Sequence, residues 1–87
     1  LRRYNFTKAF LGINGIAIAQ GFTTPDPEEA AVKALAADRA QSVFVLADSS
    51  KFGQVTAAAM FPIDAACVIT DRLPDPRYRD YTDVREV

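Results

Sequence analysis

Three short apolar runs constrain the fold of this 87-residue chain more than any other feature. They cover Ala9 to Ile13, Val43 to Ala47 and Ala66 to Ile69, and turn-forming or charged residues bound each of them. Their length, together with the β-branched residues of the second and third runs, predicts buried strands. Because the runs are almost continuously apolar rather than alternating, we expect strands covered on both faces, as in a parallel sheet. A weaker fourth strand is predicted at Val84 to Val87.

A helix is predicted between the first two runs, from Asp26 to about Ala40. Asp26 can cap the backbone, Pro27 suits the first helical position, and Glu29 stands three residues after the cap, as in a capping box. The residues that fall at helical spacing and would pack on the sheet are Val32, Leu35, Ala36 and Ala40. The residues expected to face away from the sheet are Lys33, Asp38 and Arg39.

Two shorter helices are predicted further along the chain, at Gln54 to Phe61 and at Asp75 to Tyr81. Pro62 ends the first, and Pro76 stands at the first position of the second. This alternation predicts a single α/β domain, a parallel sheet whose strands are joined by right-handed crossover helices. Because ligands bind beyond the carboxyl ends of the strands in such sheets, the loops after the first two strands are the expected site.

The composition excludes several kinds of chemistry within this chain. It contains no histidine and only one cysteine, so neither a zinc site nor a Ser-His-Asp triad can be built from it. We therefore expect no catalytic residue, no metal and no cofactor. Cys67, which lies in an apolar run, is interpreted as a buried structural thiol rather than a reactive one.

Charge and hydropathy indicate the setting of the chain. Ten basic and eleven acidic residues give a net charge of -1, whereas phosphate backbones are bound by clustered positive charge, so the chain alone is not expected to bind DNA. No apolar stretch approaches the roughly 20 residues of a membrane span, and the first residues lack the apolar core of a signal peptide. These features favour the cytoplasm, with no membrane partner. Since the chain opens at Leu1 without an initiating Met, we expect it to start inside a longer protein.

A glycine-rich connection follows the first predicted strand. It contains Gly12-Ile13-Asn14-Gly15 and then Gly21-Phe22-Thr23-Thr24, directly before the helix. Glycine allows a ligand to approach the backbone closely, and a helix N-terminus offers free amides to an anion. The spacing is neither a dinucleotide fingerprint nor a Walker loop, so simple turn chemistry is the alternative.

A polar turn follows the second predicted strand, with the sequence Asp48-Ser49-Ser50-Lys51. Lysine is a natural partner for phosphate, and hydroxyl and carboxylate groups can bond sugar hydroxyls. The alternative is an ordinary strand-to-helix turn, capped by Ser49 or Ser50, with Lys51 in solvent.

Three segments carry a specific resemblance: FLGINGIAIAQGFTTPDPEEAAVK (Phe10 to Lys33), VFVLADSSKFG (Val43 to Gly53) and VITDRLP (Val68 to Pro74). They resemble the effector domain of DeoR-family repressors, which typically regulate sugar and polyol catabolic operons. In order, they carry the family's G-x-x-G loop, G-[LF]-T-T segment, E-x-x-V-K helix start and LADSSKFG turn. The similarity covers nearly the whole chain and is weakest from Arg77 onwards.

The resemblance implies a fold related to ribose-5-phosphate isomerase and coenzyme A transferases, in which a parallel sheet presents a phosphosugar pocket. It implies that residues 1–87 are the C-terminal portion of the effector domain, and that the upstream half and an N-terminal winged helix-turn-helix lie outside this chain. DNA would be contacted only through that absent domain. The whole protein is expected to be a homo-oligomer.

Carried over by position, the resemblance also assigns residues to effector binding. Lys51 would meet a phosphate or sugar oxygen, and Asp48 and Ser50 would shape its turn. The residues of the facing wall would be Gly12, Gly15, Gly21 and Thr23. The residues at the start of the helix, near that wall, would be Glu29 and Lys33.

Alternatives stay open for three of the charged residues. A capping box explains Glu29 without any ligand. Lys33 can form an ion pair with Glu29 at i, i+4 or lie on a solvated helix face. Asp71 matches the family's I-T-D, and can equally cap or orient the turn in which it lies.

Taken together, these features favour a sensor that binds a phosphorylated sugar and thereby shifts a two-state equilibrium of the whole regulator. The alternative is a phosphosugar isomerase-like enzyme, since ribose-5-phosphate isomerase has a similar turn and glutamate. That family, however, has a GGGAA-type loop where this chain reads GINGIAIAQGFT. A third possibility is a plain structural or dimerisation module.

Overall fold

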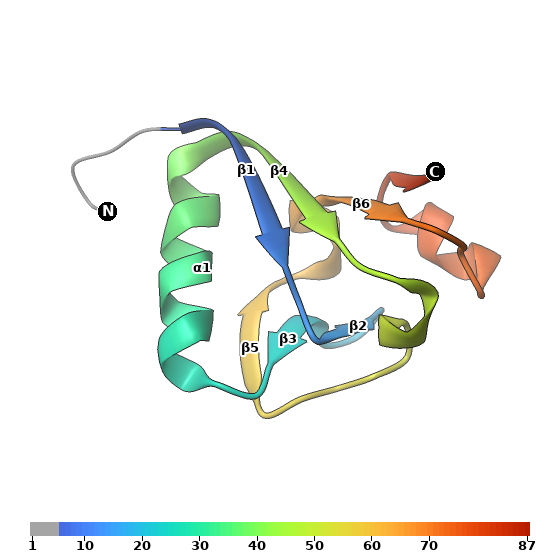
Figure 1. The fold of residues 1–87 in the computed structure, drawn as a ribbon, viewed down its shortest axis with the longest axis horizontal. Helices are drawn as coiled ribbons and strands as arrows, with labels where there is room; N and C mark the ends of the chain where they lie inside the picture. The colour runs from blue at the N-terminus through green and yellow to red at the C-terminus, as the bar shows by residue number, and fades with distance from the viewer. Residues whose placement is uncertain (1–5) are drawn as a thin grey trace.

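The main sheet formed by residues 6–87 has four parallel strands. The computed structural model describes residues 6–87 (Figure 1). The strands, in spatial order, are β1 (Phe6–Gly12), β4 (Ala40–Leu46), β6 (Cys67–Thr70) and β7 (Val84–Glu86). All three neighbouring pairs are parallel. The predictions of three adjacent parallel strands and of a fourth at the C-terminal end are therefore confirmed.

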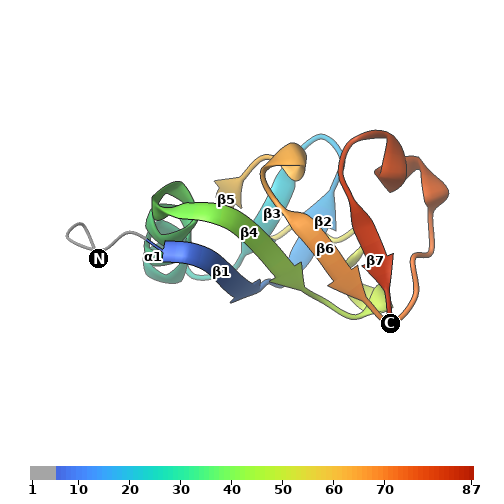
Figure 2. The ribbon, with the colours of Figure 1, turned by 90° about the horizontal axis from the view of Figure 1, so that it is seen from above.

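The connections between these strands contain one α-helix and a second, smaller sheet. The helix is α1 (Pro27–Arg39), and the 3-10 helices are η1 (Ser49–Lys51), η2 (Ile63–Ala65) and η3 (Pro76–Asp80). The second sheet is antiparallel, in the order β2 (Gly15–Ala17), β3 (Gly21–Thr24) and β5 (Ala58–Phe61). Figures 1 and 2 show α1 and this second sheet together on one side of the main sheet.

The start of α1 is the one predicted. Asp26 is the N-cap, its carboxylate accepts from the backbone N–H of Glu28 at 2.9 Å, and Pro27 opens the helix. The capping box is not completed, because the Glu29 carboxylate pairs with Lys33 instead. At its other end the helix passes directly into β4 at Ala40.

The prediction that both faces of the main sheet are covered is wrong for residues 6–87. On the inner face Val45 and Val68 are fully buried, whereas on the outer face Phe10 is 58% exposed and Leu46 47% exposed. The Phe10 ring stacks on Phe44 at a centroid separation of 5.1 Å. The reason is topological: the strands advance in one direction across the sheet, and right-handed crossovers then all lie on the same face.

The helix predicted at Gln54 to Phe61 is also wrong, since residues 58–61 form strand β5. Its residues pair with β3, with Thr24 opposite Ala58 and Phe22 opposite Phe61. Alanine favours a helix intrinsically. Here the pairing with β3 and the packing of Phe61 against Phe22, at a ring separation of 5.1 Å, override that preference.

Other local predictions are corrected in detail. Val32 is 55% exposed rather than packed on the sheet, and Ala30 is the buried residue of α1. The segment predicted as a helix from Asp75 to Tyr81 is the 3-10 helix η3, with Asp75 as its cap. Within residues 6–87, no helix is both long and apolar enough to cross a membrane.

Candidate functional site

The candidate site lies where the main-sheet strands end. Gly12 at the end of β1 is level with Leu46 at the end of β4, which is level with Ile69 in β6. The loops that follow these strands therefore emerge at one edge of the sheet, as expected for parallel strands. They are the glycine-rich connection, the turn at residues 48–51 and the turn at Asp71.

The turn after β4 is capped by a carboxylate rather than by a serine. Asp48 accepts from the backbone N–H of Ser50 at 2.9 Å and from the Ser50 hydroxyl. These two hydrogen bonds, the hydroxyl's first, lower the pKa of the Asp48 carboxyl below its ordinary value. Asp48 is therefore ionised at neutral pH, and the predicted role of Asp48 and Ser50 in shaping the turn has a geometric basis.

Asp71 joins the ends of β4 and β6. Its Oδ1 accepts from the backbone N–H of Ser49 at 2.9 Å and from the Thr70 hydroxyl at 3.2 Å. This contact gives Asp71 the turn-orienting role that the sequence left open. The amides of Ser49 and Ser50 are both engaged by carboxylates, so an anion at this turn would have to be bound by side-chain donors.

Lys51 is the cation that this turn presents. It is partly exposed and lies at the end of η1. Among residues 6–87 no carboxylate lies within ion-pair distance of its ammonium, and none accepts a hydrogen bond from it. Arg72, next to Asp71, is a second exposed cation at this edge that sequence reasoning did not select, although its place beside the I-T-D motif was a usable signal.

Lys33 is occupied by contacts within the protein. Its ammonium donates to the Gly12 carbonyl oxygen at 2.6 Å and to Glu29 Oε1 at 2.5 Å. The ion pair considered from the sequence is therefore present, and it brings together Gly12, Glu29 and Lys33. These contacts tie α1 to the end of β1 at the rim of the candidate site. The lysine side chain is 21% exposed and the glutamate side chain 45% exposed.

The other residues of the predicted wall lie inside the small sheet. Gly15 pairs with Thr23, and Thr23 is 1% exposed, with its hydroxyl accepting from the backbone N–H of Thr56 at 3.0 Å. Gly21 is buried at a positive φ of 76°. Packing thus accounts for these three residues, and their contact with an effector stays a prediction.

Asn14 is a polar residue of the wall that sequence reasoning quoted but did not select. It is exposed between Gly12 and Gly15, and its Oδ1 accepts from the Thr24 hydroxyl at 3.0 Å. Its backbone N–H donates to the backbone carbonyl oxygen of Thr23 at 3.1 Å. The Asn14 side chain therefore stands at the rim, held by the buried Thr24.

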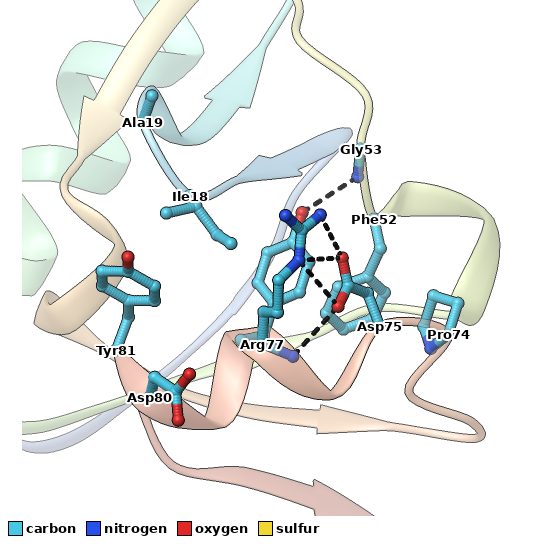
Figure 3. A pocket seen from close by; sticks show the side chains of 10 residues that line it. Ile18, Ala19, Phe52, Gly53, Pro74, Asp75, Arg77, Asp80 and Tyr81 are labelled. Carbon is cyan, nitrogen blue, oxygen red and sulfur yellow. Dashed lines mark hydrogen bonds and ion pairs between the residues drawn. The ribbon is translucent and has the colours of Figure 1, made fainter.

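A cavity lies beside this edge rather than at it. It has a volume of about 570 Å³, and none of the predicted site residues lines it. Figure 3 shows Ile18 and Tyr81 on one side, Phe52 and Gly53 on the other, and the Asp75–Arg77 ion pair between them. Its contact with the candidate site is through Phe52 and Gly53, which directly follow Lys51 in the chain.

Titratable groups elsewhere in residues 6–87 do not form a metal site. Within the part of the chain that the structure describes, no three histidine, cysteine, aspartate or glutamate side chains are placed to hold a metal ion. Cys67 is a partly exposed free thiol, not a fully buried one. Burial, and then the hydrogen bond from its Sγ to Asp83, raise the pKa of the thiol.

Comparison with known proteins identifies the domain. A family model described as the DeoR C terminal sensor domain matches residues 1–72. The chain is 43% identical over 88 residues to the HTH-type transcriptional regulator FruR of Bacillus subtilis (strain 168), a match covering 98% of this chain and 35% of that protein. It is 33% identical to the regulator IolR of the same organism, over 100% of this chain and 35% of that protein.

A third relative is the HTH-type transcriptional regulator GlpR of Haloferax volcanii, 37% identical over 83 residues, covering 92% of this chain and 32% of that protein. The chain thus spans about a third of the length of these relatives. All three are named as transcriptional regulators, so the chain is a sensor domain rather than an enzyme, as predicted. It belongs to the DeoR C-terminal sensor domain family.

Proposed function

We propose that this chain is the effector-sensing part of a bacterial repressor and that it binds a phosphorylated sugar at the carboxyl edge of its main sheet. Lys51 supplies the positive charge for the phosphate, while Asp48, Ser50 and the rim around Gly12 contact or position the sugar. Glu29 and Lys33 support the rim. We propose only an indirect role for Gly15, Gly21 and Thr23, because they pack in the small sheet behind the rim.

One observation carries this proposal: the turn at residues 48–51 is held rigidly while its lysine stays uncommitted. Carboxylates of Asp48 and Asp71 fix the turn through the amides of Ser50 and Ser49. No carboxylate of residues 6–87 pairs with the Lys51 ammonium. A fixed backbone with a free cation is suited to bind an anion, because little ordering is needed on binding.

The proposal extends to the whole regulator. The chain covers about a third of relatives that are HTH-type regulators, and its own charge of -1 does not favour DNA binding. DNA would be contacted by a separate N-terminal domain in a cytoplasmic homo-oligomer. The effector changes operator affinity only if it binds the DNA-bound and free states with different affinity.

The test is titration calorimetry on the intact regulator with ribose 5-phosphate, fructose 1-phosphate, fructose 6-phosphate, glucose 6-phosphate, glycerol 3-phosphate and inorganic phosphate. Lys51→Ala removes one charge-assisted hydrogen bond, worth about 1.5–3 kcal/mol. The affinity for the best-binding compound should therefore fall by roughly 10- to 150-fold. Operator binding without the compound should be unchanged.

Lys8→Ala is the matched control, because Lys8 is an exposed lysine in β1 away from the carboxyl edge. It removes the same charge and should leave the affinity unchanged. If Lys51→Ala binds the best compound as tightly as Lys8→Ala does, Lys51 is not the phosphate partner. If the wild type binds none of the compounds, the proposed ligand class is wrong.

A further inference from the structure

The end of the turn that carries Lys51 is attached to a distant part of the chain through a tyrosine. Tyr78 belongs to η3, is 5% exposed, and its hydroxyl donates to the Ile16 carbonyl oxygen at 3.0 Å. The same hydroxyl accepts from the backbone N–H of Gly53 at 3.2 Å. Gly53 also donates to the Ile16 carbonyl at 2.7 Å. One hydroxyl therefore contacts both β2 and the residue two positions after Lys51.

The ring of Tyr78 reinforces this attachment. It packs edge-to-face on Phe52, with a centroid separation of 5.0 Å and an interplanar angle of 80°. Phe52 forms an isolated parallel bridge with Ile16. Aromatic pairs of this geometry add to the stability that burial alone provides. Phe52, which follows Lys51, therefore packs on Tyr78 through its side chain and pairs with β2 through its backbone.

A cavity lies next to Tyr78 and Phe52, and hydrogen bonds therefore fix the position of the Gly53 backbone. Tyr78 lines the cavity of about 570 Å³, together with Phe52 and Gly53 (Figure 3). Phe52 is buried, but Gly53 is exposed and has open space around its Cβ position. Steric packing alone therefore does not define where the backbone of Gly53 lies. The hydroxyl of Tyr78 adds a second directional restraint to the hydrogen bond that Gly53 makes with the Ile16 carbonyl.

We propose that Tyr78 is a positioning residue for the effector turn: its hydroxyl fixes Gly53 against β2 and thereby sets the place of the Lys51 ammonium. The inference rests on the proposed function of Lys51. It adds η3 to the machinery of the sensor, although the family model matches only residues 1–72 and so does not include Tyr78. Asp71 holds the start of the turn, and Tyr78 holds its end.

Tyr78→Phe isolates the hydroxyl, because the phenylalanine ring keeps the contact with Phe52. The Ile16 carbonyl and the Gly53 N–H remain bonded to each other, so the variant leaves neither group unpaired and should fold. Tyr81→Phe is the matched control: Tyr81 follows η3 and lines the same cavity, is 51% exposed, and its hydroxyl makes no hydrogen bond with residues 6–87.

The experiment measures two quantities on the intact regulator and on both variants. The first is the affinity for the best-binding compound of the phosphosugar panel, by calorimetry. Loss of the hydroxyl, which makes one hydrogen bond to Gly53 and one to Ile16, should weaken this affinity by about 2- to 10-fold in Tyr78→Phe. Tyr81→Phe should leave the affinity unchanged. The second is amide hydrogen exchange without ligand, which should accelerate by a similar factor at Lys51 to Gly53 in Tyr78→Phe alone.

The outcomes separate this inference from the proposed function. A purely structural tyrosine would lower the denaturation midpoint yet leave the affinity equal to that of Tyr81→Phe, and this result would overturn the inference while the Lys51 proposal stands. If the wild type binds no compound of the panel, the Lys51 proposal fails. Exchange at residues 51–53 then still decides whether Tyr78 holds the turn, and equal exchange in the two variants would overturn it.

Discussion

Removing the ammonium of Lys33 should destabilise the domain without directly weakening effector binding. Lys33→Met keeps an unbranched apolar stem of similar length and removes only the charged head. In the structure this head joins the Gly12 carbonyl at 2.6 Å and Glu29 at 2.5 Å. The substitution thus separates an anchoring role of Lys33 from a ligand-binding one.

The magnitude follows from these two contacts. A hydrogen bond involving a charged group contributes about 1.5–3 kcal/mol net, and an exposed i, i+4 ion pair about 0.3–0.5 kcal/mol. Since Glu29 is 45% exposed and the pair is screened by solvent, we place the total loss at about 1–2 kcal/mol. Glu29→Gln removes only the ion pair and should cost at most about 0.5 kcal/mol.

The assay is urea unfolding of the intact regulator, followed by the fluorescence of its tyrosines or by circular dichroism. Lys8→Met is the control, as Lys8 is an exposed lysine of β1. The anchoring role would be refuted by an unfolding free energy for Lys33→Met equal to that of Lys8→Met. A large loss of phosphosugar affinity at unchanged stability would instead assign Lys33 to the effector.

Two further predictions concern backbone geometry and thiol chemistry. Gly21→Ala should cost more than about 3 kcal/mol in urea unfolding, because a left-handed φ costs a non-glycine residue about 1–2 kcal/mol and the added Cβ would overlap the Phe61 carbonyl oxygen. Gly53 also has a positive φ, but a Cβ added there would meet open space. Gly53→Ala should therefore lower the free energy of unfolding by only about 1–2 kcal/mol. Equal losses for the two variants would contradict this reasoning. Because burial and Asp83 raise the pKa of Cys67, its thiolate fraction at pH 8 is below that of a free cysteine, so iodoacetamide should react slowly. Asp83→Asn should accelerate this alkylation, and an unchanged rate would show that Asp83 does not control the thiol.

The elements that sequence reasoning predicted correctly are those whose signal is local. An apolar run between polar turns is a strand wherever it packs, so the strands around Val45 and Val68 could be predicted together with their parallel order. Asp26 caps α1 by accepting a hydrogen bond from the backbone N–H of Glu28, only two residues away in the chain. Asp48 caps the turn of Lys51 over the same short distance, so the polar cluster after β4 was recognisable as well.

What only the tertiary structure decided depends on partners far apart in the chain. Ala58 to Phe61 have helical propensity, and they form a strand because β3 offers an edge to pair with. The sequence could not show that Lys33 reaches Gly12 across 21 residues, or that Tyr78 bonds Ile16 across 62. Nor could the sequence show that the outer face of the sheet is exposed within residues 6–87. Apolar residues on both faces of a strand predict that both faces are buried. Which face this chain itself covers depends on the direction of the crossovers.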